Sequence, residues 1–193
     1  MTAAVMGTPF DYPLSSRMDE NDSILVFDKV LVPWENVFAY GDIDKVNNFF
    51  PRSGFLPRFM FQGCTRLAVK LDFMAGLLNR ALIASGSNTF RGVQVQLGEV
   101  INWRNTFWAL SDGMAGNPQP WVGDTVLPNG ATSSAYRMLA TEAWPRVKEI
   151  VQQVVASGLI YLPSSAKDFA NPEIDRYLKQ YVRGSNGIGY RER

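Results

Sequence analysis

The sequence contains no histidine, and Cys64 is the only cysteine among its 193 residues. A disulfide needs two cysteines, and zinc sites and iron–sulfur clusters are built from several cysteine or histidine ligands. None of these can be assembled within this chain, and no histidine is available as a general base. No two carboxylates have a spacing that marks an acid–base pair. The sequence therefore indicates neither a catalytic residue nor a metal site.

A surplus of charge of one sign is also lacking. Nineteen basic and eighteen acidic residues leave a formal net charge of +1, without a long run of either sign. Binding to nucleic acid or to an anionic membrane surface is typical of chains with a basic patch or stripe. The composition therefore predicts no nucleic-acid partner, and it favours neutral molecules, cofactors or other protein chains.

Long hydrophobic runs are missing as well. No stretch reaches the roughly 18 consecutive apolar residues that span a membrane. The first residues do not show the charged segment and apolar core of a secretory signal. We therefore expect no membrane association, and a soluble protein of a reducing compartment, the cytoplasm.

The strongest positive signal is a helical pattern over residues 61–85. Leu67, Leu71, Met74 and Leu78 recur at the spacing of one helix face. Cys64 belongs to the same apolar stripe, so we expect an inert core thiol there. So much apolar surface predicts a central helix of a bundle, buried on more than one side.

Similar periodicity predicts further helices around this one. A short helix is expected at residues 43–50, ended by Pro51, and a second long helix at residues 90–115. After a glycine- and proline-rich loop at 116–132, a third helix should start at Ser133 or Ser134 and reach residue 156, kinked or broken at Pro145. A fourth opens at residues 171–172. The sequence predicts a mainly α fold, an up-and-down four-helix bundle.

Only residues 23–32, SILVFDKVLV, have the β-branched, alternating pattern of a strand, after a polar turn at residues 19–22. A single strand leaves its backbone donors and acceptors unpaired. The rest of the chain offers no comparable strand to pair with it. We therefore expect the sequence to be a fragment, whose missing sheet partners belong to another domain or chain.

Two stretches have features of anion sites. Arg91, Gln94 and Gln96 lie at the start of the second long helix, where free backbone N–H groups favour a pyrophosphate. The alternative is a solvated first turn. Residues 184–189, GSNGIG, have the glycine spacing of a phosphate loop, but no strand precedes them, which favours a flexible helix terminus.

Several longer motifs resemble one family. FDYPLSSR at residues 10–17, VFDKVLVPWENV at 26–37, TRLAVKLDF at 65–73, LPSS at 162–165 and YVRGS at 181–185 occur in the order found in the 4-hydroxyphenylacetate 3-monooxygenase family. Its members are oxygenase components of two-component phenol hydroxylases. The resemblance covers essentially the whole chain.

The resemblance implies the acyl-CoA dehydrogenase-like fold. Residues 1–40 would be the end, with the last strand, of its middle β-domain, and residues 41–193 most of its C-terminal four-helix bundle domain, incomplete at its C-terminus. It also implies ortho-hydroxylation of a phenol to a catechol through a flavin C4a-hydroperoxide. Reduced FAD would come from a separate reductase, and the bundle would build a homotetramer. The family's phenol-binding residues lie upstream of this sequence, so no catalytic residue is carried over.

By analogy with the wider superfamily, the start of the second long helix and the end of the third approach a neighbouring subunit's flavin. This implies cofactor contacts from Arg91, Gln94, Gln153 and Gly158. A related branch, the 4-hydroxybutyryl-CoA dehydratases, carries an iron–sulfur cluster with cysteine and histidine ligands, and the missing histidine argues against it. Two other readings stay open: a non-catalytic helical oligomerisation module, and an acyl-CoA dehydrogenase-like flavoprotein.

Overall fold

The computed structural model describes residues 7–18, 23–163 and 165–192; the turn expected at residues 19–22 lies outside these ranges. The described residues fall into two compact units. One comprises those within 1–41 and 161–183, and the other those within 42–160 and 184–193. The second unit contains the long helices and therefore most of the core.

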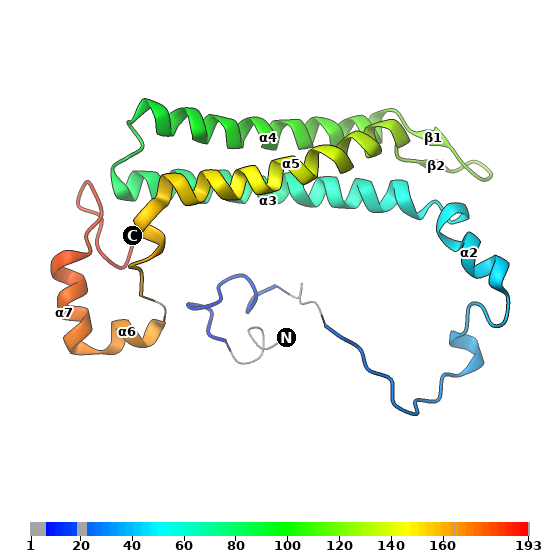
Figure 1. Ribbon diagram of the computed structural model, residues 1–193, viewed down its shortest axis with the longest axis horizontal. Coiled ribbons are helices and arrows are strands. Elements are labelled where there is room, and N and C mark those ends of the chain that lie inside the picture. Colours follow the sequence, from blue (N-terminus) through cyan, green and yellow to red (C-terminus); the bar gives the residue numbers. More distant parts are fainter. Residues whose placement is uncertain (1–6, 19–22, 164, 193) are drawn as a thin grey trace. The chain divides into compact units, whose positions relative to one another are not determined.

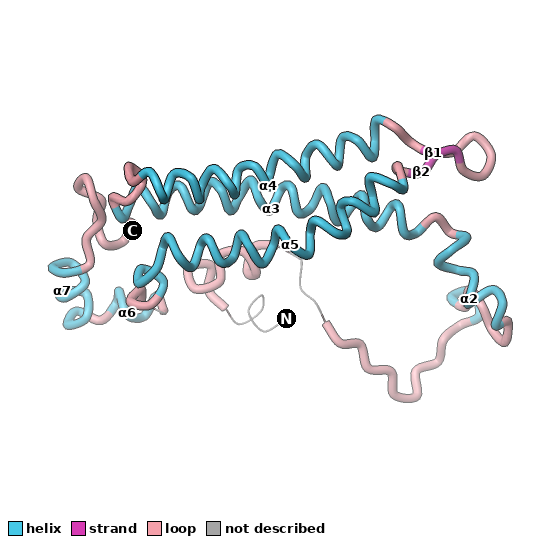
Figure 2. Tube along the Cα trace, turned by 45° about the horizontal axis from the view of Figure 1, so that its top comes forward, coloured by secondary structure: helices cyan, strands magenta, loops and turns pink. Residues whose placement is uncertain are grey.

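Three long helices form this core. Helices α3 (Phe55–Ser85), α4 (Arg91–Gly116) and α5 (Gly130–Val155) pack against one another, side by side, and successive helices run in opposite directions (Figures 1 and 2). Their apolar faces meet in one cluster, in which the largest fully buried side chains are Phe107, Leu71, Leu82, Met114, Ile150, Val100 and Val147. The expected central helix and its mainly helical surroundings are confirmed.

Two helices start at other residues than the apolar pattern predicted. Helix α3 starts at Phe55, before the expected residue 61, because Pro57 lies in its first turn, where a missing N–H costs no hydrogen bond. Helix α5 starts at Gly130 because the Asn129 side chain accepts from the Thr132 backbone N–H. The expected start at Ser133 or Ser134 is wrong. Ser133 is buried inside the helix.

Neither internal proline ends a helix. Helix α2 (Ile43–Arg52) continues through Pro51, and α5 is not broken at Pro145. Each proline removes one backbone hydrogen bond, to the carbonyl four residues earlier. Those carbonyls belong to Asn47 and Thr141, whose exposed positions let water replace the lost donor.

Short elements connect and follow the bundle. A short antiparallel hairpin lies in the loop between α4 and α5. Its two strands, β1 (Gln119–Pro120) and β2 (Val126–Leu127), have two residues each. The helix η2 (Ala156–Leu159) follows α5, and η1 (Trp34–Asn36) lies in the other unit.

That unit also contains α6 (Ala166–Ala170) and the expected fourth helix, α7 (Pro172–Tyr181), capped by Asn171. Helix α7 packs on α6 within this unit. In the bundle unit, α3, α4 and α5 pack on one another, and α2 packs on α3. Within the unit of α6 and α7, the Asp11 carboxylate accepts from the Ala166 N–H (2.7 Å), and Phe10 packs edge-on against Phe169.

Residues 23–32 do not form the expected strand. They have no hydrogen-bonded strand partner among the described residues, and bulky side chains such as Ile24, Val26 and Leu31 are exposed. A strand needs a neighbour to pair its backbone groups, and the only ladder in the described chain is the short β1–β2 hairpin. Residues 23–32 therefore have the composition of a strand, but no neighbouring strand pairs with them among the described residues.

Candidate functional site

The predicted cofactor contacts lie at one end of the bundle, where α4 begins and α5 ends. Arg91 is the first residue of α4, Gln153 is in the last turn of α5, and Gly158 follows in η2. At this end of the bundle Gln96 also connects the two helices, because its Nε2 donates to Oε1 of Gln153 (3.0 Å). Gln94 instead donates to the Asn88 carbonyl (3.1 Å), across the α3–α4 turn.

This end of α4 suits an anion. Phe90, at the N-cap, supplies no side-chain hydrogen bond, and the first turn contains no acidic residue. The first backbone N–H groups of a helix have no partner within the helix, and the helix dipole makes this end positive. The exposed Arg91 side chain adds a cation at the same place. The sequence pattern had indicated residues 91–96, including Gln96, as a possible anion site, but it did not predict the Gln96–Gln153 hydrogen bond.

A segment distant in sequence fixes the neighbouring end of α3. The helix ends at Gly86, whose φ of +75° is the left-handed conformation that glycine adopts without strain. The Ser185 N–H then donates to the Ala84 carbonyl (2.7 Å), and the Ser185 hydroxyl donates to the Ile83 carbonyl (2.5 Å). Residues 184–189, considered above as a phosphate loop or a flexible terminus, therefore supply a cap for α3.

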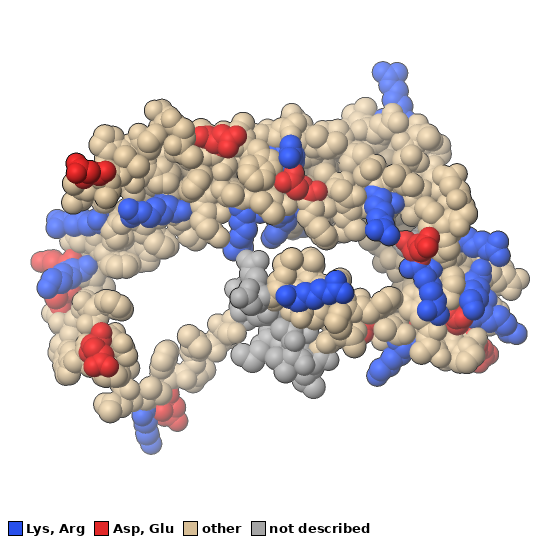
Figure 3. All heavy atoms as spheres, turned by 180° about the vertical axis from the view of Figure 1, so that it is seen from behind, with Lys and Arg blue, Asp and Glu red and all other residues tan. Residues whose placement is uncertain are grey.

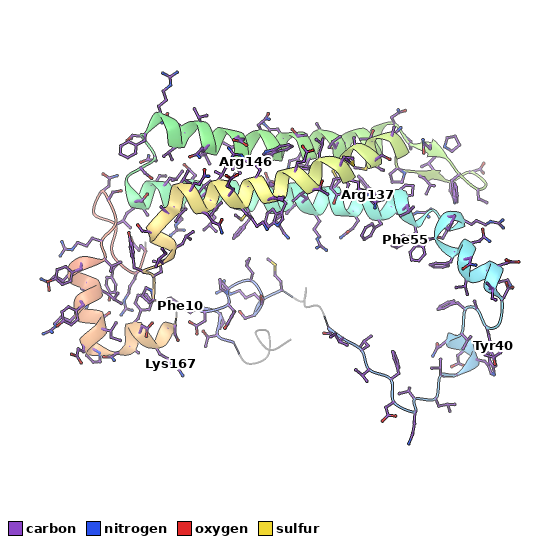
Figure 4. All side chains as sticks on the ribbon, in the orientation of Figure 1. Phe10, Tyr40, Phe55, Arg137, Arg146 and Lys167 are labelled. Atoms are coloured by element: carbon purple, nitrogen blue, oxygen red, sulfur yellow. The ribbon has the colours of Figure 1, made fainter. Side chains whose placement is uncertain are left out.

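Two polar clusters tie the helices together beside the core. The Arg146 guanidinium of α5 binds both carboxylate oxygens of Glu99 on α4 (2.7 and 2.8 Å) and one of Glu149 (2.9 Å). Figure 4 labels Arg146 on α5. Hydrogen bonding to Arg146 lowers the pKa of Glu99 below its usual value. All three side chains are hydrogen-bonded to one another through Arg146, so this cluster stabilises the bundle and is not a free reactive centre.

The second cluster joins α3 to α4. Asp72 accepts from Arg104 and from the Trp108 indole N–H (3.0 Å). The hydrogen bond from Arg104 is the main cause of a lowered Asp72 pKa, and desolvation opposes it. Asp72 is therefore ionised at neutral pH and is not a proton donor there.

A groove of about 630 Å³ lies at the opposite end of the bundle, between the α2–α3 junction, the β1–β2 hairpin and α5. Its wall is mostly apolar, with Pro57, Met60, Trp121 and Leu127 among the lining residues, and Arg137 is its cation. The lining contains no carboxylate, thiol or phenol. Its hydroxyls, Ser133 and Ser134, donate to the Asn129 and Gly130 carbonyls, and no carboxylate or histidine in the lining could activate them as nucleophiles.

Within the described ranges, no group of three or more His, Cys, Asp or Glu side chains is placed to hold a metal ion. None of the helices described combines the length and apolar character that crossing a membrane requires.

Comparison with known proteins gives two family matches that together span nearly the whole chain. The profile described as 4-hydroxyphenylacetate 3-hydroxylase N terminal matches residues 1–39, and the profile described as C terminal matches residues 46–193.

Individual relatives agree with these profiles. The chain is 63% identical over 188 residues to a 4-nitrophenol 2-monooxygenase oxygenase component from Rhodococcus, covering 97% of this chain and 36% of that protein. It is 56% identical over 193 residues to a 4-hydroxyphenylacetate 3-monooxygenase oxygenase component from Pseudomonas aeruginosa, covering 100% and 37%. The chain thus spans little more than a third of the length of these relatives.

Solved structures show the same fold. A crystal structure of the oxygenase component of 4-hydroxyphenylacetate 3-monooxygenase complexed with FAD superposes with a TM-score of 0.83 at 31% identity, covering 96% of this chain and 38% of that one. An archaeal 4-hydroxybutyryl-CoA dehydratase shares the fold at a TM-score of 0.70 and 19% identity. The mainly helical chain has the expected acyl-CoA dehydrogenase-like fold. On these matches, the chain belongs to the 4-hydroxyphenylacetate 3-hydroxylase family.

Proposed function

We propose that this chain is part of the oxygenase component of a reduced-flavin-dependent monooxygenase that converts a phenol into a catechol. The observation that carries the proposal is the family match over residues 1–39 and 46–193. Its reaction position follows from the names of the relatives. In 4-nitrophenol the 2-position and in 4-hydroxyphenylacetate the 3-position are both adjacent to the hydroxyl-bearing carbon. We therefore propose ortho-hydroxylation of a para-substituted phenol.

The proposed cofactor is FAD, used in its reduced form. Bound reduced flavin would activate O2 for transfer of one oxygen atom to the phenol, whereas the protein would bind the flavin, orient the phenol and exclude water. The start of α4 fits the flavin's pyrophosphate, because it joins an uncapped helix N-terminus to the Arg91 cation without an acidic neighbour. We propose four cofactor-binding residues: Arg91 and Gln94 at the start of α4, Gln153 in the last turn of α5 and Gly158 in η2.

The proposal includes partners and a domain division. A separate flavin reductase would supply reduced FAD, and the bundle would assemble as a homotetramer in the cytoplasm. Residues 1–40 would be the end of a middle β-domain, and residues 41–193 the helical domain. Support for this division comes from the unpaired apolar segment at residues 23–32, which has the composition of a sheet strand.

The test is product formation by the full-length gene product. Purified protein, a flavin reductase, NADH, FAD and 4-hydroxyphenylacetate or 4-nitrophenol are incubated in air, and the products are separated by chromatography. The expected product is the corresponding catechol, formed only when the reductase is present. Release of hydrogen peroxide alone with every phenol tried would contradict the proposal.

A binding measurement separates this proposal from a purely structural role. Anaerobic titration of reduced FAD into the full-length protein should saturate, and a helical oligomerisation module would show no saturable binding. Addition of acyl-CoA to the protein with oxidised FAD should leave the flavin oxidised. Bleaching of the oxidised flavin would indicate an acyl-CoA dehydrogenase.

A further inference from the structure

Hydrogen bonds hold the side-chain amide of Gln153 at both its oxygen and its nitrogen. Its Oε1 accepts from Nε2 of Gln96 on α4 (3.0 Å), and its Nε2 donates to Oε1 of Glu149, one turn earlier on α5 (2.9 Å). The other oxygen of Glu149 accepts from Arg146 (2.9 Å). Gln153 is one of the proposed cofactor contacts, whereas Glu149 has so far been described only as part of a stabilising cluster.

These contacts form one chain of hydrogen bonds, and its charged members fix its direction. A guanidinium only donates hydrogen bonds, and a carboxylate only accepts them. Glu149 is therefore an acceptor on both sides, so the Gln153 amide has to present its nitrogen to it. The Gln153 oxygen then faces Gln96, which has to present its own nitrogen. Reversing either amide would place two acceptors or two donors against each other.

A second contact between α4 and α5 holds the charged end of this chain. Arg146 binds both carboxylate oxygens of Glu99 on α4 (2.7 and 2.8 Å), so the residue that holds Glu149 is itself fixed. The spacings of three residues on α4 and of three and four on α5 keep these side chains on one face of each helix. The Gln96–Gln153 and Glu99–Arg146 contacts thus work together to set how the two helices meet near the end of α5.

The chain of hydrogen bonds matters for binding because Gln153 is exposed. A free glutamine side chain samples several rotamers, and ordering it on a ligand weakens binding. The Gln153 amide is already ordered at both of its ends. It keeps a second N–H and a second oxygen lone pair for a ligand. A ligand at this end of the bundle would therefore meet one donor and one acceptor in set positions.

We propose that Glu149 is a positioning residue for the cofactor, because it fixes the orientation of the Gln153 amide while Arg146 holds Glu149 in place. This inference rests on the proposed function, in which Gln153 contacts the flavin cofactor, and it deepens that function by adding a residue that acts through Gln153. Charge argues against a direct contact from Glu149, since a carboxylate repels the pyrophosphate of a flavin dinucleotide.

The test replaces Glu149 by its amide in the full-length protein. Glu149→Gln keeps the size of the side chain but can donate as well as accept, so Gln153 is no longer held in one orientation. Glu142→Gln is the matched control, because Glu142 is an exposed carboxylate of α5, whereas Arg146 pairs with Glu99 and Glu149. Gln153→Ala and its combination with Glu149→Gln complete a double-mutant cycle.

Three quantities are measured for each protein. Anaerobic titration gives the dissociation constant of reduced FAD, and single-turnover experiments give the rate of phenol hydroxylation at saturating reduced FAD. Thermal unfolding verifies that each variant is folded.

Glu149→Gln is expected to raise the dissociation constant of reduced FAD about threefold to tenfold, the effect of one side chain that has to be ordered on binding. The single-turnover rate should stay unchanged, because Glu149 does not touch the reacting atoms. In the Gln153→Ala background, Glu149→Gln should have no further effect, since its action passes through the Gln153 amide. Glu142→Gln should leave the affinity unchanged or slightly higher, because it removes a negative charge.

An unchanged or lower dissociation constant in folded Glu149→Gln protein overturns the inference, because only the effect of the lost charge then remains. Equal weakening with and without Gln153→Ala also overturns it, since that result shows a structural effect on the bundle. The same holds if Gln153→Ala alone leaves the affinity for reduced FAD unchanged. Failure of the proposed function looks different: the unmodified protein itself then binds no reduced FAD, and the inference falls with it.

Discussion

At the scale of single residues, Cys64 has the environment of an unreactive thiol. Its side chain is fully buried, its Sγ donates to the Phe107 carbonyl (3.3 Å), and burial raises its pKa to about 11. We expect no reaction with a thiol reagent at pH 8 in the native protein, and one equivalent per chain after denaturation. With a chromogenic disulfide reagent, the absorbance of the thiolate that it releases measures the extent of labelling in the native and in the denatured protein. Rapid stoichiometric labelling of the native protein would contradict this expectation.

The same residue predicts a loss of stability at high pH. An unfolded cysteine has a pKa near 8.5, whereas the folded value is about 11. Folding therefore favours the neutral thiol. Its contribution to stability is fully present below about pH 8.5 and falls as pH rises towards 11. Cys64→Ser, which does not titrate in this range, should remove that part of the alkaline slope in urea unfolding. An unchanged slope would show that other groups cause it.

Two carboxylates predict the opposite dependence at low pH. The folded pKa values of Asp72 and Glu99 are lowered by Arg104 and Arg146. Their contribution is present above the unfolded pKa values of about 3.9 and 4.3 and is lost as pH falls through the lower folded values. The side chains are 39% and 35% exposed, so the effect is modest, below about 1 kcal/mol for an exposed pair.

We expect Asp72→Asn to lower the unfolding temperature at pH 7 and to reduce its decline between pH 6 and pH 3. Asp112→Asn is the control, because Asp112 is an exposed carboxylate on the same helix as Arg104. Calorimetry at several pH values measures both variants. Identical profiles for the two variants would show that the Asp72 cluster does not contribute.

These polar clusters mark a limit of residue-level prediction. Cys64 was correctly placed in the core because the helical period depends only on neighbouring residues. The pairs Asp72–Arg104 and Glu99–Arg146 join residues 32 and 47 positions apart. Such pairing depends on how helices rotate and pack against each other. Both partners of each pair can be seen in the sequence, but their closeness in space cannot be predicted from it.

At the scale of elements, periodicity predicted the helices well and their ends less well. The apolar spacing of α3, α4 and α5 gave correct helices because a buried helical face dictates it. The same spacing also predicted α7, although none of its residues is buried. The start of α5 was missed because Asn129 lies in a loop without periodicity. In the candidate site, the run containing Arg91, Gln94 and Gln96 was identified from composition alone. Its hydrogen bond to Gln153 needed the packed bundle.

The cap on α3 by residues 184–188 gives a prediction for one glycine. A Cβ at Gly184 would lie 2.7 Å from the Cβ of Ile188 and 3.1 Å from the Ala84 carbonyl oxygen. Gly184→Ala is therefore expected to destabilise the bundle by about 1–3 kcal/mol through overpacking. Chemical unfolding followed by circular dichroism measures the change.

Gly98→Ala is the matched control. Gly98 lies within α4 with nothing within 4 Å of an added Cβ, so alanine should stabilise that helix by up to about 1 kcal/mol. Destabilisation by both substitutions, or by neither, would show that the close approach of Gly184 to α3 does not determine the outcome.

At the scale of the whole molecule, the described chain leaves much apolar surface in water. Ile24, Leu31 and Phe38 are each more than 90% exposed, and Val69, Phe73 and Leu77 form an exposed stripe along α3. In Figure 3 uncharged side chains cover most of the bundle face, and charged side chains occur there singly or in small groups. Apolar patches of this kind usually mark surfaces that other domains or chains cover. The relatives, at nearly three times this length, have additional polypeptide.

We therefore expect the 193-residue chain, expressed by itself, to self-associate and to bind a hydrophobic dye, because burial of apolar side chains drives association. Sedimentation velocity should show concentration-dependent species larger than the 21.6 kDa monomer. Dye fluorescence per chain should fall several-fold in the full-length protein, because we expect its additional polypeptide to cover the same side chains. Replacing Ile24, Val26 and Leu31 together with threonine should reduce both effects in the isolated chain, whereas replacing the buried Val147 should not. A monomer without dye binding would show that these apolar segments cover one another in solution, and residues 23–32 would then need no partner sheet.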